Sequence, residues 1–212
     1  PRPATASEAP GTWNWALEND GTFKDDMDFD EYMSMSASLG IEPLVVVNAL
    51  SWKYDGGPSY QELKTSAVEW VKYAKAKGYV VAYWQIGNEM DHHQDLMTRQ
   101  EYADLYFDFA AAMKAEDPDI TVGTGILGNT AYYNDILAGD QSLVDFLSVH
   151  QYLFGQPQLT SYEGYRNFSG SMLGNVNRVT GANGNSGKPV RVTETKAYGM
   201  DRDRKSVEEG RR

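Results

Sequence analysis

Two glutamates at the ends of apolar runs are the residues of this chain best suited to do chemistry. Glu89 ends the run Tyr-Val-Val-Ala-Tyr-Trp-Gln-Ile-Gly-Asn-Glu, residues 79–89, and Glu194 ends Pro-Val-Arg-Val-Thr-Glu, residues 189–194. β-Branched and aromatic runs of this kind predict buried strands. Parallel-sheet enzymes hold their catalytic groups at the carboxyl ends of such strands. Two carboxyl groups there are the minimum equipment for cleaving a glycosidic bond.

The rest of the chain predicts the elements that must position these two glutamates. Buried-strand patterns lie near residues 43–48, 79–86, 120–124, 146–150 and 189–193. Helical patterns lie between them, at residues 29–39, 59–77, 98–113, 132–137 and 162–179. Capping boxes open the second and third of these helices, and Gly40 and Gly78 are placed to end the first and second. Strands that alternate with helices predict an α/β fold with parallel strands.

Composition limits the classes of partner. A chain of 212 residues, 41% of them hydrophobic, can bury the core of one domain. The net charge of −11 disfavours a nucleic-acid partner and suits a neutral substrate. The chain has no cysteine, which excludes disulfides and thiol chemistry, and no apolar run approaches the roughly 18 residues of a membrane span. We expect a carbohydrate partner, no nucleic acid and no membrane. The compartment stays open.

Aromatic residues are abundant, with 14 tyrosines and 5 tryptophans. Such residues can fill a core or lie under sugar rings, where flat apolar faces meet C–H groups. Trp13 and Trp15 stand in a loop context and are candidates for a sugar platform. The alternative, that they cover an edge of the core, is equally open.

Residues 1–200 predict one catalytic domain. Residues 201–212 are strongly charged and almost free of apolar side chains. They predict a solvated or disordered tail.

Other chemistries find less support. His92 and His93, flanked by Asp91 and Asp95, could suggest a metal site. Adjacent histidines point apart on a regular backbone, so we expect no metal and no cofactor. The chain has no Gly-x-Ser-x-Gly elbow, so an esterase would need an unmarked serine beside His150.

The segment Trp84-Gln85-Ile86-Gly87-Asn88-Glu89 resembles the fourth-strand motif of the retaining (β/α)8 glycoside hydrolases of clan A. Val192-Thr193-Glu194 resembles their seventh-strand motif. The resemblance covers about residues 11–200. It is nearest the α-L-arabinofuranosidase and β-agarase-like branches.

This resemblance implies roles for individual residues. Glu89 would be the acid/base, Glu194 the nucleophile, and Asn88 a ligand of the sugar 2-hydroxyl. His150 and Tyr152 match positions on the sixth strand that line the site. The remaining substrate-binding candidates are Asn48, Trp84, Trp13 and Trp15.

The five strands correspond to the third to seventh strands of that family, and a full barrel typically needs about 250 residues. We therefore expect a partial (β/α)8 TIM barrel, a truncated fragment that lacks about three strands. Open barrel edges expose strand backbone and apolar interior. We expect a homo-oligomer whose copies cover these edges.

The function that follows is a retaining glycoside hydrolase acting on a plant or algal polysaccharide or its oligosaccharides. Two alternatives remain open. One is a catalytically weak or inactive barrel fragment that binds carbohydrate, and the other is a different hydrolase, such as an esterase, using the same pocket. The sequence does not indicate the sugar, the linkage, or endo versus exo action.

Overall fold

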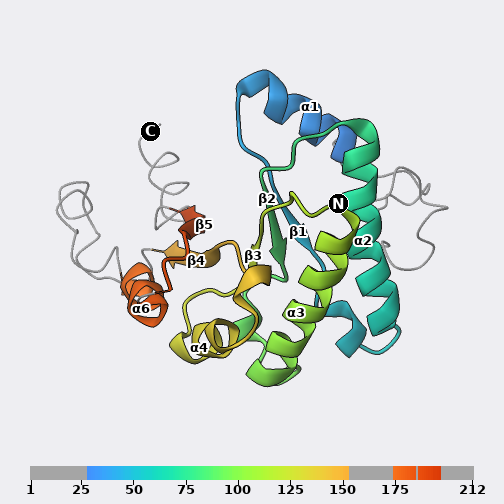
Figure 1. Ribbon diagram of the computed structural model, residues 1–212. Coiled ribbons are helices and arrows are strands. Elements are labelled where there is room, and N and C mark those ends of the chain that lie inside the picture. Colours follow the sequence, from blue (N-terminus) through green and yellow to red (C-terminus); the bar gives the residue numbers. More distant parts are fainter. Residues whose placement is uncertain (1–27, 153–173, 185, 197–212) are drawn as a thin grey trace, which may run out of the picture.

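The computed structural model describes residues 28–152, 174–184 and 186–196, and Figure 1 shows its strands alternating with helices. Trp13, Trp15, most of the helix predicted at residues 162–179 and the charged tail lie outside this part of the chain. Within it, no helix has the length and apolar character needed to cross a membrane. The main elements, in chain order, are α1 (Phe29–Leu39), β1 (Leu44–Val47), α2 (Tyr60–Lys77), β2 (Tyr83–Ile86), α3 (Arg99–Glu116), β3 (Val122–Thr124), α4 (Thr130–Ala138), β4 (Leu147–Tyr152), α6 (Gly174–Asn183) and β5 (Val190–Lys196).

All strand pairs are parallel and follow chain order. β1, β2 and β3 form one sheet, and β4 pairs with β5 in a second. A bridge between Gly123 and Phe146 connects β3 to the start of β4. The helices contact one another in sequence order, α2 with α3, α3 with α4, and α4 with α6. The prediction of an α/β fold in the form of a partial (β/α)8 barrel is confirmed.

The helix signals in the sequence are confirmed at both ends. Ser59 and Thr98 cap α2 and α3 through reciprocal bonds with glutamates three residues on. Gly40 and Gly78 end α1 and α2 with φ values of 64° and 70°, a left-handed conformation that favours glycine. These caps fix where each helix stops and the next strand begins.

β2 is shorter than its apolar run predicted. It begins at Tyr83, which lies opposite Leu44, the first residue of β1. Val80 is 82% exposed. Residues 79–82 pair with no neighbouring strand among the described residues. The apolar run is therefore longer than the strand that it contains.

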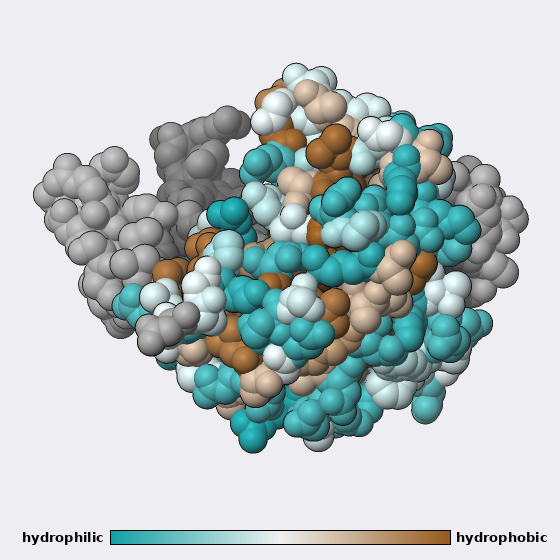
Figure 2. All heavy atoms as spheres, in the orientation of Figure 1, coloured by the Kyte–Doolittle hydropathy of each residue, from teal (hydrophilic) through white to brown (hydrophobic). Residues whose placement is uncertain are grey.

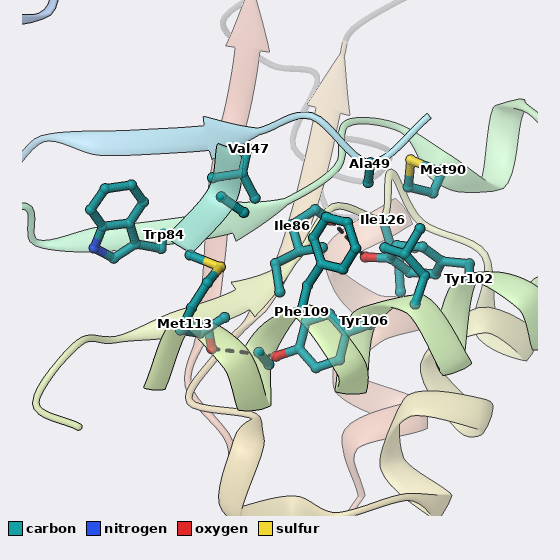
Figure 3. Packing of buried hydrophobic residues seen from close by; sticks show 14 of the residues in the cluster. Val47, Ala49, Trp84, Ile86, Met90, Tyr102, Tyr106, Phe109, Met113 and Ile126 are labelled. Atoms are coloured by element: carbon teal, nitrogen blue, oxygen red, sulfur yellow. Dashed lines mark hydrogen bonds between the residues drawn. The ribbon is translucent and has the colours of Figure 1, made fainter. Parts of the chain in front are cut away.

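The core lies between the strands and the helices that cover them (Figure 3). Trp84 and Ile86 of β2 point toward α3, where they meet Phe109 and Met113, and all four are almost fully buried. Full burial of each such side chain contributes roughly 1.5–3 kcal/mol, so this layer holds β2 firmly in place. Figure 2 shows hydrophobic residues also reaching the surface near α1.

Candidate active site

Glu89 leaves β2 in an unusual backbone conformation. Its φ of 48° and ψ of 41° place it in the left-handed region, and among the described residues it is the one non-glycine with positive φ. Gly87, two residues earlier, has a φ of 78°. A side chain in this region costs about 1–2 kcal/mol, a strain often found at functional positions. Because of this turn, the Glu89 side chain does not point in the direction that it would have if β2 continued through residue 89.

Tyr102 of α3 supports this turn from the helix side. Its hydroxyl donates to the Ile86 carbonyl at 3.0 Å and accepts from the Gly125 amide at 2.8 Å. Burial raises the pKa of Tyr102 well above its ordinary value, which keeps the hydroxyl protonated as a donor. The Met90 amide also donates to the Gly125 carbonyl at 2.9 Å. These bonds tie the turn that carries Glu89 to the end of β3.

Gly125 lets the two chain segments approach this closely. A Cβ at this position would collide with the Gly87 carbonyl. Glycine is therefore needed here for space, and this explains a residue to which the sequence patterns gave no role.

His150 lies between the two glutamates. It is completely buried on β4, and its Nδ1 is 2.9 Å from Glu89 Oε1 and 3.6 Å from Glu194 Oε2. A register shift between β4 and β5 at Val149 places His150 opposite Glu194. Such an irregularity turns a side chain toward a site at the sheet edge.

The three side chains form a compact group. One oxygen of each glutamate and one ring nitrogen of His150 lie within 4.8 Å of one another. The Glu89 side chain is 24% exposed and that of Glu194 is 43% exposed, so solvent reaches both carboxyls. Nδ1 and the Glu89 carboxyl can share a proton, with either group as the donor depending on protonation.

The same three atoms could geometrically hold a divalent cation. In the part of the chain that the structure describes, this is the one group of three or more histidine and carboxylate residues close enough to do so. The histidine and carboxylate side chains of residues 91–95 do not form a second group of this kind among the described residues.

His92 is a neighbour of Glu89 that the sequence patterns did not assign to the site. Its Nδ1 is 3.4 Å from Glu89 Oε2, and its side chain is 58% exposed. A short 3-10 turn, Met90–His92, brings residues three apart together. The sequence shows that Glu89 and His92 are three residues apart, but it did not predict the 3-10 turn that brings their side chains together.

Asn88 and Asn48 border a cavity of about 480 Å³ beside the C-terminal end of β1. The Asn48 side-chain oxygen accepts from the amides of Leu50 and Ser51, so it also shapes its own loop. Glu89 and Glu194 are absent from the cavity lining. The two asparagines therefore line this cavity, and the two glutamate carboxyls lie outside its lining.

The prediction that Trp84 contacts substrate is wrong. Trp84 is 1% exposed and packs toward α3 (Figure 3). Side chains alternate along a strand, and the residues of β2 that point to the helices cannot reach the opposite face. Tyr152 belongs to β4 by its backbone. The Tyr152 side chain, like Trp13 and Trp15, lies outside the described part.

Sequence comparison finds curated relatives but no matching family model. Two proteins named "Probable alpha-L-arabinofuranosidase C", from two strains of Aspergillus fumigatus, are each 26% identical over 166 residues. The match covers 66% of this chain and 32% of each relative. The chain therefore spans about a third of the length of the curated relatives it matches.

Solved structures share the fold. AbfB, a family 51 α-L-arabinofuranosidase from Bifidobacterium longum, aligns with a TM-score of 0.61 at 20% identity, covering 88% of this chain and 41% of that one. A GH39 β-xylosidase from Caulobacter crescentus aligns at 0.56, with 20% identity and coverages of 86% and 44%. An endo-1,4-β-D-mannanase from Thermotoga petrophila aligns at 0.53, with 16% identity and coverages of 79% and 58%. The fold of this chain therefore resembles part of the (β/α)8 barrels of these enzymes.

Proposed function

We propose that this chain carries the catalytic centre of a retaining glycoside hydrolase, with Glu89 as acid/base and Glu194 as nucleophile. The observation that carries the proposal is that one carboxyl oxygen of Glu89, which follows β2, and one of Glu194, in β5, lie within 4.8 Å of each other. Retaining enzymes hold their two carboxyls about 5–5.5 Å apart, whereas inverting enzymes need about 6.5–9.5 Å to admit a water. The short separation favours retention.

The reaction would proceed by double displacement. The Glu194 carboxylate attacks the anomeric carbon, the glycosidic bond breaks, and the Glu89 carboxylic acid gives its proton to the leaving oxygen. Water then attacks the glycosyl–Glu194 ester while the Glu89 carboxylate accepts the proton from that water. His150, which contacts both carboxyls, orients them without entering either step.

The substrate we favour is a plant or algal polysaccharide, or an oligosaccharide derived from it. The curated relatives are named as arabinofuranosidases, and structures of similar fold act on arabinofuranosides, β-xylosides and mannans by name. Aryl α-L-arabinofuranosides are therefore the first substrates to try, followed by aryl β-D-xylosides and β-D-mannosides.

Separate Glu89→Gln and Glu194→Gln variants test the proposal with these aryl glycosides. Removing an acid/base group costs about 10²–10⁴-fold in rate, and removing the nucleophile should cost at least as much. Asp95→Gln, an exposed change in the same loop, should leave the rate unchanged within about two-fold. Full activity in both glutamate variants would refute the two-carboxylate mechanism.

The second candidate is carbohydrate binding without turnover. It is favoured by the cavity beside Asn48 and Asn88, whose lining includes neither glutamate. Binding to an oligosaccharide that survives in both glutamate variants, with no hydrolysis by the wild type, would support this reading. An esterase would instead cleave aryl esters in all three proteins.

A further inference from the structure

Asp91 is a buried carboxylate beside the site that the proposed reaction does not use. It is 4% exposed and lies two residues after Glu89. Its Oδ1 accepts from the Leu127 amide at 2.8 Å, and its Oδ2 accepts from the amides of Gly128 and Asn129 at 3.0 and 2.9 Å. The loop between β3 and α4 is thus wrapped around this one side chain.

Three backbone donors explain how a carboxylate can be buried here. No lysine, arginine or histidine of the described residues forms an ion pair with Asp91. Burying a charge without compensation is costly, but hydrogen bonds from backbone amides to a charged group are strong and directional. The arrangement therefore fixes the loop rigidly relative to the turn that carries Glu89.

The loop that binds Asp91, residues 127–129, also contacts the backbone of His150. The Leu127 carbonyl accepts from the His150 amide at 2.9 Å. Gly128 packs against Asn175, whose side-chain amide donates to the His150 carbonyl at 2.8 Å. Contacts therefore run without a break from Asp91 through the loop to His150.

We propose that Asp91 is a positioning residue that holds the Glu89 turn and His150 in register through the loop at residues 127–129. This inference rests on the proposed function. Because His150 Nδ1 lies 2.9 Å from Glu89, a small movement of the loop changes the contact that orients the acid/base group. A misplacement of about 1 Å at a catalytic group can cost on the order of 10²-fold in rate.

The test compares Asp91→Asn with Asp145→Asn in the full chain. Asp145 is a matched control, because it also accepts from a backbone amide, that of Val122, at 2.7 Å, and it makes no contact with the glutamates. In Asp91→Asn we expect kcat on aryl glycosides to fall about 10- to 100-fold with KM changed less than about two-fold. In Asp145→Asn we expect kcat to stay within about two-fold.

A second readout does not depend on turnover. The chain has three histidines, so the imidazole ¹⁵N resonances can be assigned. We expect the His150 Nδ1 resonance to shift in Asp91→Asn and to be unchanged in Asp145→Asn. If the wild type cleaves no glycoside, the proposed function fails, and this comparison still decides the role of Asp91.

Two results would overturn the inference. One is an Asp91→Asn variant with normal kcat, and the other is a His150 resonance that moves equally in both aspartate variants. If Asp91→Asn does not fold, Gly128→Ala tests the same link, because its Cβ would lie 2.8 Å from Asn175 Cγ and either the loop or the Asn175 side chain that holds the His150 carbonyl must shift. Normal kcat and an unmoved His150 resonance in Gly128→Ala would also refute the proposal.

Discussion

At the scale of single residues, Glu89 is set by contacts that come from outside its own strand. Its left-handed backbone is held between Tyr102 and the close approach of Gly125 to Gly87. Its carboxyl lies between two imidazoles, His150 at 2.9 Å and His92 at 3.4 Å. A strained residue persists when its surroundings over-determine it, as they do here.

Replacing Tyr102 by Phe tests this support. The change removes one hydroxyl and leaves the buried Gly125 amide without that acceptor, so the free energy of unfolding should fall by about 1–3 kcal/mol. Urea unfolding measures it. Tyr73→Phe is the control, since its hydroxyl contacts Asp30 at an exposed position, and it should change stability by less than about 0.5 kcal/mol. Equal losses in the two variants would contradict the account.

At the scale of elements, the parts that could be predicted from sequence are those with local signals. The boxes at Ser59 and Thr98 and the glycines at residues 40 and 78 depend on contacts between near neighbours, and the helices begin and end as they indicate. The register shift at Val149 and the Asp91 loop depend on contacts between distant segments. A sequence pattern among near neighbours does not predict contacts between distant segments.

The burial of Trp84 shows a related limit. The sequence motif placed an aromatic residue near Glu89, but a continuous apolar strand does not reveal which side faces the helices. Packing against α3 decided that question. By contrast, the two rim carboxylates were predictable, because parallel strands bring their carboxyl ends to one edge.

The cap of α3 predicts a pH dependence of stability. The hydrogen bond from Lys53, then those from Thr98, lower the pKa of Glu101 to about 2, from an ordinary value of 4.5. A carboxyl whose pKa is depressed on folding stabilises the protein above its unfolded pKa, and this contribution is lost as pH falls toward the folded pKa. Wild type should therefore exceed Glu101→Gln in stability above about pH 4.5, and the difference should shrink toward pH 2.

Urea unfolding of both proteins between pH 7 and pH 2.5 measures this difference. Glu69→Gln serves as the control, because Glu69 contacts Lys72 at 3.3 Å on an exposed helix face. Pairs of that kind contribute little, so its curve should follow that of the wild type. A stability difference for Glu101→Gln that is constant with pH would contradict the assignment.

At the scale of the whole molecule, the described strands form an incomplete barrel. β1 and β5 stand at the ends of the strand order, and the chain covers 41% of the AbfB structure. Leu39, Ile41 and Val80 are 63%, 52% and 82% exposed. Figure 2 shows hydrophobic surface near α1. Self-association that covers open edges stays a prediction, and exposed apolar surface of this kind is what motivates it.

Azide rescue of Glu89→Ala and Glu194→Ala tests the central claim most directly, with NMR determining the configuration of each glycosyl azide. In Glu194→Ala, azide should take the nucleophile's place and give the inverted product. In Glu89→Ala, it should attack the glycosyl–Glu194 ester from the opposite face and give the retained product. The same configuration from both variants, or no glycosyl azide from either, would contradict the assignment of Glu194 as nucleophile and Glu89 as acid/base.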